Sequence, residues 1–298
     1  MMRSFASQQE SLARRASFLR LTSRTVSESI RAGSFRSLVR GQGIEFNGVR
    51  DYVRGDDIRA IDWNVSARMG RPYVKLFEAE RELTMCVVLD ASFSMRSGTG
   101  ARTKYAVAAE AVALLAFAAE HNGCPFGAVF FDAAVRFSGE PKVGTKHTMV
   151  VLKKLDECAT GGGRGSVLPN ALTGSGSLLR TRALVFIFSD FRSVGWEAPL
   201  ARLSQVHDCV AVRVTTPADE AIPPVGTLPV VDSETDVRTV FPTLSTAFRR
   251  EWKTAADSRA ARWYAVCRRR GVTPLSLSTT DDPAAVLASF FAQKRRTV

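Results

Sequence analysis

Several stretches of this sequence are continuously apolar, where a half-buried strand would alternate apolar and polar residues. They are "MCVVLD" (85–90), "ALVFIFSD" (183–190) and "CVAVRV" (209–214). Strands of this kind have both faces covered, which is the arrangement of a parallel sheet between two layers of helices. Segments with helical apolar spacing separate them along the chain. The sequence therefore predicts an α/β domain with a doubly wound, mostly parallel sheet.

The other predicted elements follow the same rhythm of strand and helix. Apolar runs predict strands at residues 84–90, 126–132, 183–189, 208–214 and 272–278. Apolar positions at helical spacing predict helices at residues 103–121, 145–157, 167–179, 197–206 and 283–294. Residues 133–139 follow the preceding strand too closely for a helical crossover, so we expect an antiparallel edge hairpin there.

The composition of the sequence changes at two points along the chain. Residues 1–40 are rich in Arg and Ser and predict a basic, helical N-terminal arm. Residues 41–82 interleave opposite charges with single aromatic residues and form an accessory segment. Residues 83–298 carry the alternation of strand and helix. An insertion at 222–270 interrupts it with a predicted hairpin and an Arg-rich helix at 244–270.

The charge of the chain is unbalanced, with 41 Lys and Arg against 29 Asp and Glu and a formal net charge of +12. Such an excess favours acidic partners, namely nucleic acid, an anionic membrane surface or an acidic protein, although a basic protein without such a partner is the alternative. The five cysteines form no CxxC pair, which is typical of reduced, core-filling thiols. The N-terminal residues contain no secretory signal, and the apolar stretch 106–121 is too short to span a bilayer. We therefore expect a soluble, cytoplasmic protein.

Oxygen-bearing side chains follow two of the predicted strands and a glycine-rich segment. They are Asp90, Ser92 and Ser94 after the first strand, Ser166 after the glycine-rich "GGGRG", and Asp190 at the end of "LVFIFSD". Ligands of open α/β sheets bind at the carboxyl ends of the strands, so we expect these side chains to converge. Two carboxylates and three hydroxyls are hard donors that suit Mg²⁺ or Mn²⁺ and leave positions for water or a partner's carboxylate.

Each of these residues also has a simpler interpretation when it is taken alone. Asp or Ser after a strand is commonly a turn former or a helix N-cap. The segment "GGGRG" lacks the Lys-Ser/Thr ending of a nucleotide-binding P-loop, so it is a weak indication of phosphate binding. The joint occurrence of the five residues in one predicted sheet is what favours a shared site.

As a set, these residues resemble the metal-ion-dependent adhesion site of von Willebrand factor A-type domains. The D-x-S-x-S of that family's first loop is matched by Asp90, Ser92 and Ser94, and the aspartate of its third loop by Asp190. The second loop of the family gives a threonine, whereas "GSVLPNAL" keeps the spacing with Ser166, which retains the hydroxyl and loses the methyl. The resemblance covers residues 83–298. It implies a Rossmann-type domain that uses Mg²⁺ or Mn²⁺ to hold an acidic side chain of a protein partner.

The preceding segment, "GQGIEFNGVRDYVRGDDIRAIDWNVSAR" (41–68), resembles the signature of a bacterial family known as domain of unknown function 58. Members place a G-x-G-x-E-F, R-x-Y, G-D-D-x-R, I-D-W, A-R series before an A-type domain. The resemblance implies a bacterial protein whose partner is a MoxR-type AAA ATPase or its client.

The charged residues of that segment support two interpretations. One is a network of ion pairs that pins the segment to the sheet domain, because opposite charges at short spacing satisfy one another. The other is a partner-binding surface, with Arg50, Arg54, Arg59, Trp63 and Arg68 as candidates. We expect Asp56 or Asp57 to cap a short helix that ends at Ser66.

We therefore expect a non-enzymatic, Mg²⁺-dependent protein-interaction module without a small-molecule substrate. One alternative is a metal-dependent hydrolase at the same site, although no base is evident, because His121, His147 and His207 do not follow strands at their carboxyl ends. Another is nucleic-acid binding through Arg-rich surfaces, which lack the interleaved aromatic residues of a base-stacking platform.

Overall fold

The computed structural model describes residues 23, 26, 27, 45–78, 83–99, 102–160, 163, 165–231 and 238–293. The chain divides into two compact units, of which residues 36–83 form the smaller and residues 84–298 the main part of the larger. Almost all of the predicted arm at 1–40 lies outside the described residues, so the three-part division of the chain stays a prediction.

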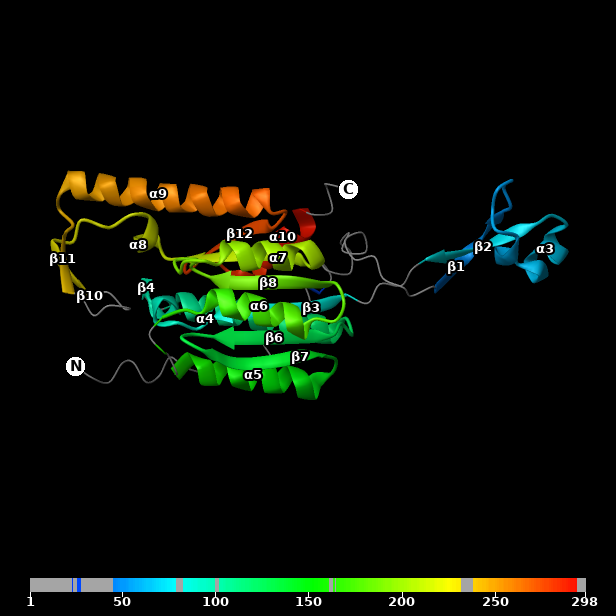
Figure 1. Cartoon of the computed structure of the whole chain (residues 1–298), viewed down its shortest axis with the longest axis horizontal. Coiled ribbons are helices and arrows are strands. Elements are labelled where there is room, and N and C mark those ends of the chain that lie inside the picture. Colours follow the sequence, from blue (N-terminus) through cyan, green and yellow to red (C-terminus); the bar gives the residue numbers. More distant parts are fainter. Residues whose placement is uncertain are drawn as a thin grey trace. The chain divides into compact units, whose positions relative to one another are not determined.

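The larger unit contains a six-stranded sheet with the spatial order β12-β9-β8-β3-β6-β7 (Figure 1). Five neighbouring strands are parallel: β12 (Thr273–Ser278), β9 (Asp208–Thr215), β8 (Ala183–Ser189), β3 (Thr84–Asp90) and β6 (Phe126–Phe131). The edge strand β7 (Val135–Lys142) pairs antiparallel with β6. The prediction of a mostly parallel sheet with an antiparallel edge is confirmed.

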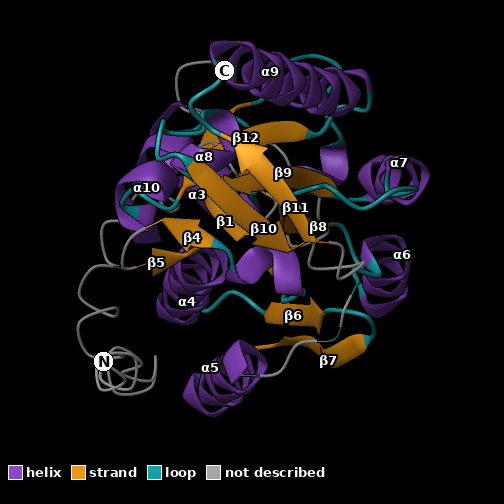
Figure 2. Ribbon diagram, turned by 90° about the vertical axis from the view of Figure 1, so that its left-hand side faces the viewer, coloured by secondary structure: helices purple, strands orange, loops and turns teal. Residues whose placement is uncertain are grey.

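Helices cover both faces of this sheet (Figure 2). One layer contains α4 (Lys104–His121), α5 (Thr145–Thr160) and α10 (Pro283–Gln293). The other contains α6 (Leu168–Leu178), α7 (Glu197–Val206) and α9 (Thr246–Arg269). Because β3 lies between α4 and α6, all seven of its residues are buried. This double burial explains why its sequence is apolar without alternation.

The predicted insertion has the expected parts, and one further helix lies just before it. Strands β10 (Thr227–Val231) and β11 (Arg238–Pro242) form the hairpin, and α9 is the Arg-rich helix. The short helix α8 (Pro217–Glu220) precedes them and begins with a capping box between Thr216 and Asp219. The sequence analysis did not anticipate α8.

The predicted edge hairpin begins later than expected. Strand β6 ends at Phe131, and β7 extends over Val135–Lys142 instead of 133–139. The cause is Asp132, whose carboxylate accepts a hydrogen bond from Ala134 N at 3.0 Å and closes the turn between the two strands.

The five cysteines are free thiols. Cys86, Cys209 and Cys267 are buried in the core, and burial raises the pKa of each of these thiols to about 12. They are therefore core-filling, as predicted, whereas Cys124 and Cys158 are half-buried. Among the described helices, none combines the length and the apolar character that crossing a bilayer requires.

The smaller unit is an antiparallel pair, β1 (Glu45–Asp51) and β2 (Tyr73–Glu78), with two short helices between the strands. The single helix expected to end at Ser66 is wrong. Asp57 caps a 3₁₀ helix, η1 (Ile58–Ala60), and Asp62 caps α3 (Trp63–Met69) by accepting from Asn64 N and Val65 N. Two caps five residues apart make two helices.

Candidate functional site

The order of the strands creates a switch point between β3 and β8. From β3 the chain crosses to β6 on one side, and it later returns to β8 on the other side of β3. In an open α/β sheet, the crevice at such a reversal is where ligands bind. Asp90 is the last residue of β3, and Asp190 follows the last residue of β8. Both predicted carboxylates therefore lie at the carboxyl edge of the switch point.

Asp90 is the centre of a hydrogen-bond cluster. Its carboxylate is 1% exposed. Oδ2 accepts hydrogen bonds from Ser166 Oγ at 3.0 Å and from Ser189 Oγ at 2.8 Å, and Oδ1 accepts from Ser92 N at 2.9 Å. The structure thus brings Ser166, in the glycine-rich loop, to the carboxylate of Asp90 at the end of β3.

None of the hydrogen-bond donors to Asp90 carries a charge. The pKa of Asp90 is raised to about 6: burial is the main cause, the neighbouring carboxylate of Asp190 adds to it, and the hydrogen bonds from Ser92 oppose it. The elevated pKa is the expected property of a carboxylate that is withdrawn from water without a cation beside it. A cation bound here would favour the ionised form.

The two serines of the first loop lie side by side. Ser92 Oγ and Ser94 Oγ are 3.1 Å apart. Ser92 occupies the N-cap position of the 3₁₀ helix η2 (Phe93–Arg96), but its side chain makes no capping hydrogen bond. The Ser166 hydroxyl likewise bonds to Asp90, and Val167 holds the N-cap position of α6. Capping therefore does not account for Ser92 or Ser166.

The glycine-rich loop before Ser166 is held by Asp132, at the end of β6. Asp132 Oδ2 accepts from Gly163 N at 2.8 Å, and Val167 N donates to the Asp132 carbonyl at 2.8 Å. A Cβ on Gly163 would lie 2.7 Å from Ala133 Cβ, and Gly165 has a left-handed φ of +100°. Both positions therefore need glycine, and together they direct Ser166 toward Asp90.

The carboxylate of Asp190 has a cationic neighbour that Asp90 lacks. Lys104, the first residue of α4, is 1% exposed, and its Nζ lies 3.4 Å from Asp190 Oδ2 and 2.9 Å from Asp219 Oδ2. Arg192 pairs with Asp219 at 2.6 Å and donates its backbone N–H to Asp190 Oδ1 at 3.2 Å. Burial alone would raise the pKa of Asp219, but Lys104 and Arg192 bring it below its usual range.

The chain after Asp190 turns sharply. Phe191 has a left-handed φ of +54°, the only such value among the described residues other than glycine. Its ring packs against Trp196 and Trp263, with centroid distances of 5.1 and 5.9 Å. Strained backbone of this kind is held by the packing around it and occurs at functional sites. Here it fixes the direction of the Asp190 loop.

Three residues of the cluster were not anticipated from the sequence: Ser189, Lys104 and Asp219. Ser189 could have been found, because Leu89 pairs with Phe188 and the next pair in that register is Asp90 with Ser189. Lys104 also gives a signal, since a lysine at the first position of a helix opposes the helix dipole and needs a specific partner. Asp219 gives no signal beyond its capping box.

Comparison with known proteins identifies the family. The model of the family described as "Protein of unknown function DUF58" matches residues 48–262. The chain belongs to this family. Uncharacterized relatives from Mycobacterium tuberculosis and Mycobacterium bovis are each 31% identical to it over 281 residues, covering 93% of this chain and 88% of theirs. The predicted membership of domain of unknown function 58 is confirmed.

Two solved structures are distant matches to this member of the family. An aerotolerance-related membrane protein from Bacteroides fragilis NCTC 9343 is 13% identical, with a TM-score of 0.46, over 72% of this chain and 100% of that one. Proximal thread matrix protein 1 from the mussel byssus is 17% identical, with a TM-score of 0.36, over 45% of this chain and 38% of that one. Likenesses this remote carry no functional inference.

The residues at the switch point have the chemistry that a divalent cation requires. Asp90 and Asp190 balance its charge, and the hydroxyls of Ser92, Ser94 and Ser166 add neutral oxygen donors. Within the described part of the chain, no three His, Cys, Asp or Glu side chains are grouped to hold a metal ion. A cation here would therefore depend on the two aspartates, the hydroxyls and water.

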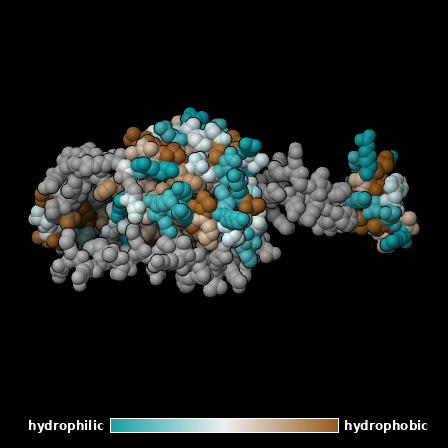
Figure 3. Space-filling model, turned by 90° about the horizontal axis from the view of Figure 1, so that it is seen from below, coloured by the Kyte–Doolittle hydropathy of each residue, from teal (hydrophilic) through white to brown (hydrophobic). Residues whose placement is uncertain are grey.

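The family signature in the smaller unit contains one well-formed ion pair. Arg50 and Asp56 form two hydrogen bonds of 2.7 Å, and Asp56 also accepts from Val53 N. The remaining candidates are exposed: Arg54, Arg59, Trp63 and Arg68. Figure 3 shows hydrophobic and hydrophilic side chains next to one another on the surface of this unit. The Arg50–Asp56 pair lies within the smaller unit, so the pinning of this segment to the sheet domain stays a prediction, and no ion pair joins the other three arginines to a described residue.

Proposed function

We propose that this DUF58 protein is a non-enzymatic, Mg²⁺- or Mn²⁺-dependent protein-interaction module with a von Willebrand factor A-like site. The observation that carries the proposal is the Asp90 cluster, a buried carboxylate whose partners are neutral donors from two loops and from the end of β8. The ligands would be Asp90, Ser92, Ser94, Ser166 and Asp190. When bound, the metal ion supplies an open coordination position for a carboxylate of the partner protein.

The electrostatics of the cluster are compatible with this role. Asp90 lacks a cation of its own, and a divalent ion would supply one. Lys104 competes for Asp190, but it lies closer to Asp219, at 2.9 Å against 3.4 Å. Arg192 also contacts Asp190, through its backbone N–H at 3.2 Å and its side chain at 3.8 Å, so a metal ion at Asp190 would compete with Arg192 while Lys104 stays paired with Asp219.

The positions of the histidines favour binding over catalysis. His147 Nε2 contacts the carbonyl of Phe126, the first residue of β6, at 2.8 Å. His207 Nδ1 accepts from the backbone N–H of Ala183, the first residue of β8, at 3.3 Å. Both lie at the amino edge of the parallel sheet, opposite Asp90, so neither is placed to act as a general base there. This weakens the hydrolase alternative.

For the partner, we infer an acidic side chain on a MoxR-type AAA ATPase or on its client, met in the cytoplasm. The excess of basic residues supports an acidic partner. The exposed Trp63, with Arg54, Arg59 and Arg68, is our candidate for a second contact surface. Tryptophan and arginine are the residue types that dominate binding energy at protein interfaces.

The experiment is partner capture from a bacterial lysate on the immobilised chain, in Mg²⁺ and in EDTA. The bait variants are Asp90→Asn, which removes the charge but keeps the shape, and the matched pair Ser166→Ala and Ser166→Thr. We expect a partner that wild type and Ser166→Thr retain in Mg²⁺ and that Asp90→Asn and EDTA release. Retention that is indifferent to both EDTA and Asp90→Asn would overturn the proposal.

A further inference from the structure

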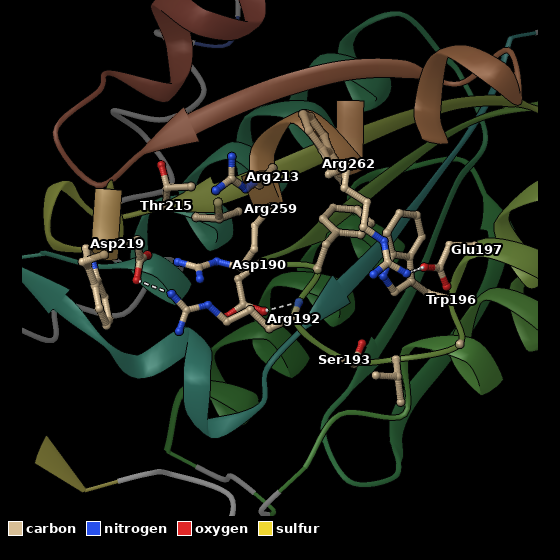
Figure 4. Close-up of a pocket in the computed structure, with 16 residues that line it drawn as sticks. Asp190, Arg192, Ser193, Trp196, Glu197, Arg213, Thr215, Asp219, Arg259 and Arg262 are labelled. Atoms are coloured by element: carbon tan, nitrogen blue, oxygen red, sulfur yellow. Dashed lines mark hydrogen bonds and ion pairs between the residues drawn. The ribbon is translucent and has the colours of Figure 1, made fainter. Parts of the chain in front are cut away.

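A cavity of about 490 Å³ opens beside Asp190, between the carboxyl ends of β8 and β9 and the helix α9. Asp190, Arg192 and Asp219 line one side of it, Arg213 comes from β9, and Arg259 comes from α9. Figure 4 shows that the guanidinium groups of Arg192, Arg213 and Arg259 point into the same part of the cavity. This pocket is not part of the metal-site prediction, although the two share Asp190.

Two of the arginines have no direct ion-pair partner. Arg192 pairs with Asp219 at 2.6 Å, and Arg262 pairs with Glu197 at 3.1 Å. Neither Arg213 nor Arg259 forms an ion pair with any residue that the structure describes. Burial lowers the pKa of both guanidinium groups, while the carboxylate of Asp219 acts in the opposite direction on each. These two guanidinium groups therefore keep their N–H donors free for a ligand.

Both of these guanidinium groups lie over aromatic rings at the distance of a cation–π contact. The Arg213 guanidinium lies 6.0 Å from the centroid of Trp263, and that of Arg259 lies 5.9 Å from Trp252. A guanidinium in such a contact still presents an edge of N–H donors. Such an edge matches a carboxylate through two parallel hydrogen bonds.

Two further polar atoms of the lining residues have no partner. Trp263 Nε1 and Ser193 Oγ are buried, and neither is hydrogen-bonded to a described residue. An indole N–H and a guanidinium can only donate, and a serine hydroxyl can donate as well. Both atoms are covered by protein, so the groups that a ligand in the pocket would meet are the two guanidiniums, which match a ligand that accepts hydrogen bonds and carries negative charge.

We propose that this pocket binds carboxylates of an acidic segment of a protein partner, with Arg213 and Arg259 as the anion-binding residues. In one respect this rests on the proposed function, because it assigns the pocket to the same partner that would meet the Asp90 site. Each guanidinium is held by its own tryptophan, so the pair presents two separate edges that suit two carboxylates along a chain. The carboxylates of Asp190, Glu197 and Asp219 in the lining disfavour a phosphate dianion more than a carboxylate.

The test is fluorescence anisotropy with fluorescein-labelled oligoglutamate, added to the full chain in EDTA. The pocket variant is Arg213→Gln with Arg259→Gln. The matched control is Arg250→Gln with Arg269→Gln, which removes the same charge from exposed positions of α9 outside the pocket. We expect the pocket variant to bind about tenfold more weakly or worse, and the control to stay within about twofold of wild type.

Equal losses in the pocket variant and the control, or wild-type affinity in the pocket variant, would overturn the proposal. Competition identifies the anion: glutarate should displace the peptide, and inorganic phosphate that displaces it at lower concentration would overturn the assignment to carboxylates. Arg259 is exposed, so Arg259→Gln alone gives a folded variant, with about threefold weaker binding expected. Because EDTA is present throughout, failure of the Mg²⁺-dependent function would leave this result unchanged.

Discussion

The Ser166 hydroxyl donates a hydrogen bond of 3.0 Å to the Asp90 carboxylate across 76 positions of sequence. The bond joins the loop after β6 and β7 to the end of β3, at the point where the strand order reverses. The Asp132 carboxylate holds this loop in place, together with Gly163 and Gly165, at which a side chain would clash or strain the backbone. A residue that only capped a helix would not need a loop held in this way. We therefore assign Ser166 to the Asp90 cluster.

Ser166→Ala and Ser166→Thr test that membership. Removing the hydroxyl takes one donor from a buried carboxylate, which costs about 1–2 kcal/mol of unfolding free energy in EDTA. Thr keeps the hydroxyl and restores the residue of the von Willebrand factor A pattern, so we expect it to match wild type. Urea unfolding measures both. Equal stability of the two variants would show that the hydrogen bond is unimportant.

Lys104→Gln tests how the cluster balances its charge without a metal. The substitution leaves Asp190 and Asp219 without their buried ammonium, and breaking a buried pair costs about 3–5 kcal/mol. We expect a much lower melting temperature in EDTA and a partial recovery in Mg²⁺, because a divalent ion would supply charge at Asp190. Thermal unfolding followed by circular dichroism measures both effects.

The control for Lys104 is Lys146→Gln, at an exposed position near the start of α5, which should change the unfolding free energy by less than about 0.5 kcal/mol. If Lys104→Gln were as stable as this control, the ion pairs of Lys104 would contribute nothing to folding.

His207 should make stability depend on pH. Burial lowers the pKa of His207 from its usual 6.5, so between the folded pKa and 6.5 the unfolded chain binds more protons than the folded one. The contribution of His207 to stability therefore rises with pH through this window and is lost as the pH falls below about 6.5, by at most about 1.4 kcal/mol per pH unit. Asp90, whose pKa is raised to about 6, contributes a slope of the opposite sign below pH 6, and it does so in wild type and variant alike. We expect the slope of stability against pH to be less positive in His207→Gln, which can still accept from Ala183 N, than in wild type.

Melting temperatures from pH 5 to pH 7.5 measure the slope. The exposed His121 at the end of α4 provides the control, and His121→Gln should keep the wild-type slope. Identical slopes in wild type and His207→Gln would contradict the prediction.

The sheet could be predicted because its physical signal is local. The seven residues of β3 are all buried. A parallel strand that is covered on both faces has an unbroken apolar sequence, and this run is visible without the structure. The short interval before β7 excluded a helical crossover, and this predicted its antiparallel pairing. The two helices of the smaller unit were missed because both Asp57 and Asp62 are caps, and only one was recognised.

The candidate site could be predicted only where its residues follow strands or a glycine-rich loop. Asp90 and Asp190 are visible because strand ends in a parallel sheet share one edge. Ser166 is visible because it follows the glycines between α5 and α6. Lys104 and Asp219 join them through α4 and α8, and no sequence pattern relates these two helices. The pocket was missed for a similar reason. The arginines of an Arg-rich helix usually face solvent, whereas the packing of α9 places Arg259 beside the carboxyl end of β9.

The measurement that tests the central claim most directly is isothermal titration of Mg²⁺, repeated with Mn²⁺, into wild type and Asp90→Asn. We predict one binding site in wild type, weakened at least about tenfold in Asp90→Asn because a carboxylate ligand is lost. The folded state of the variant is checked by its near-ultraviolet circular dichroism. Absence of a site in wild type, or equal affinity in a folded Asp90→Asn, would contradict the metal-dependent interaction proposed here.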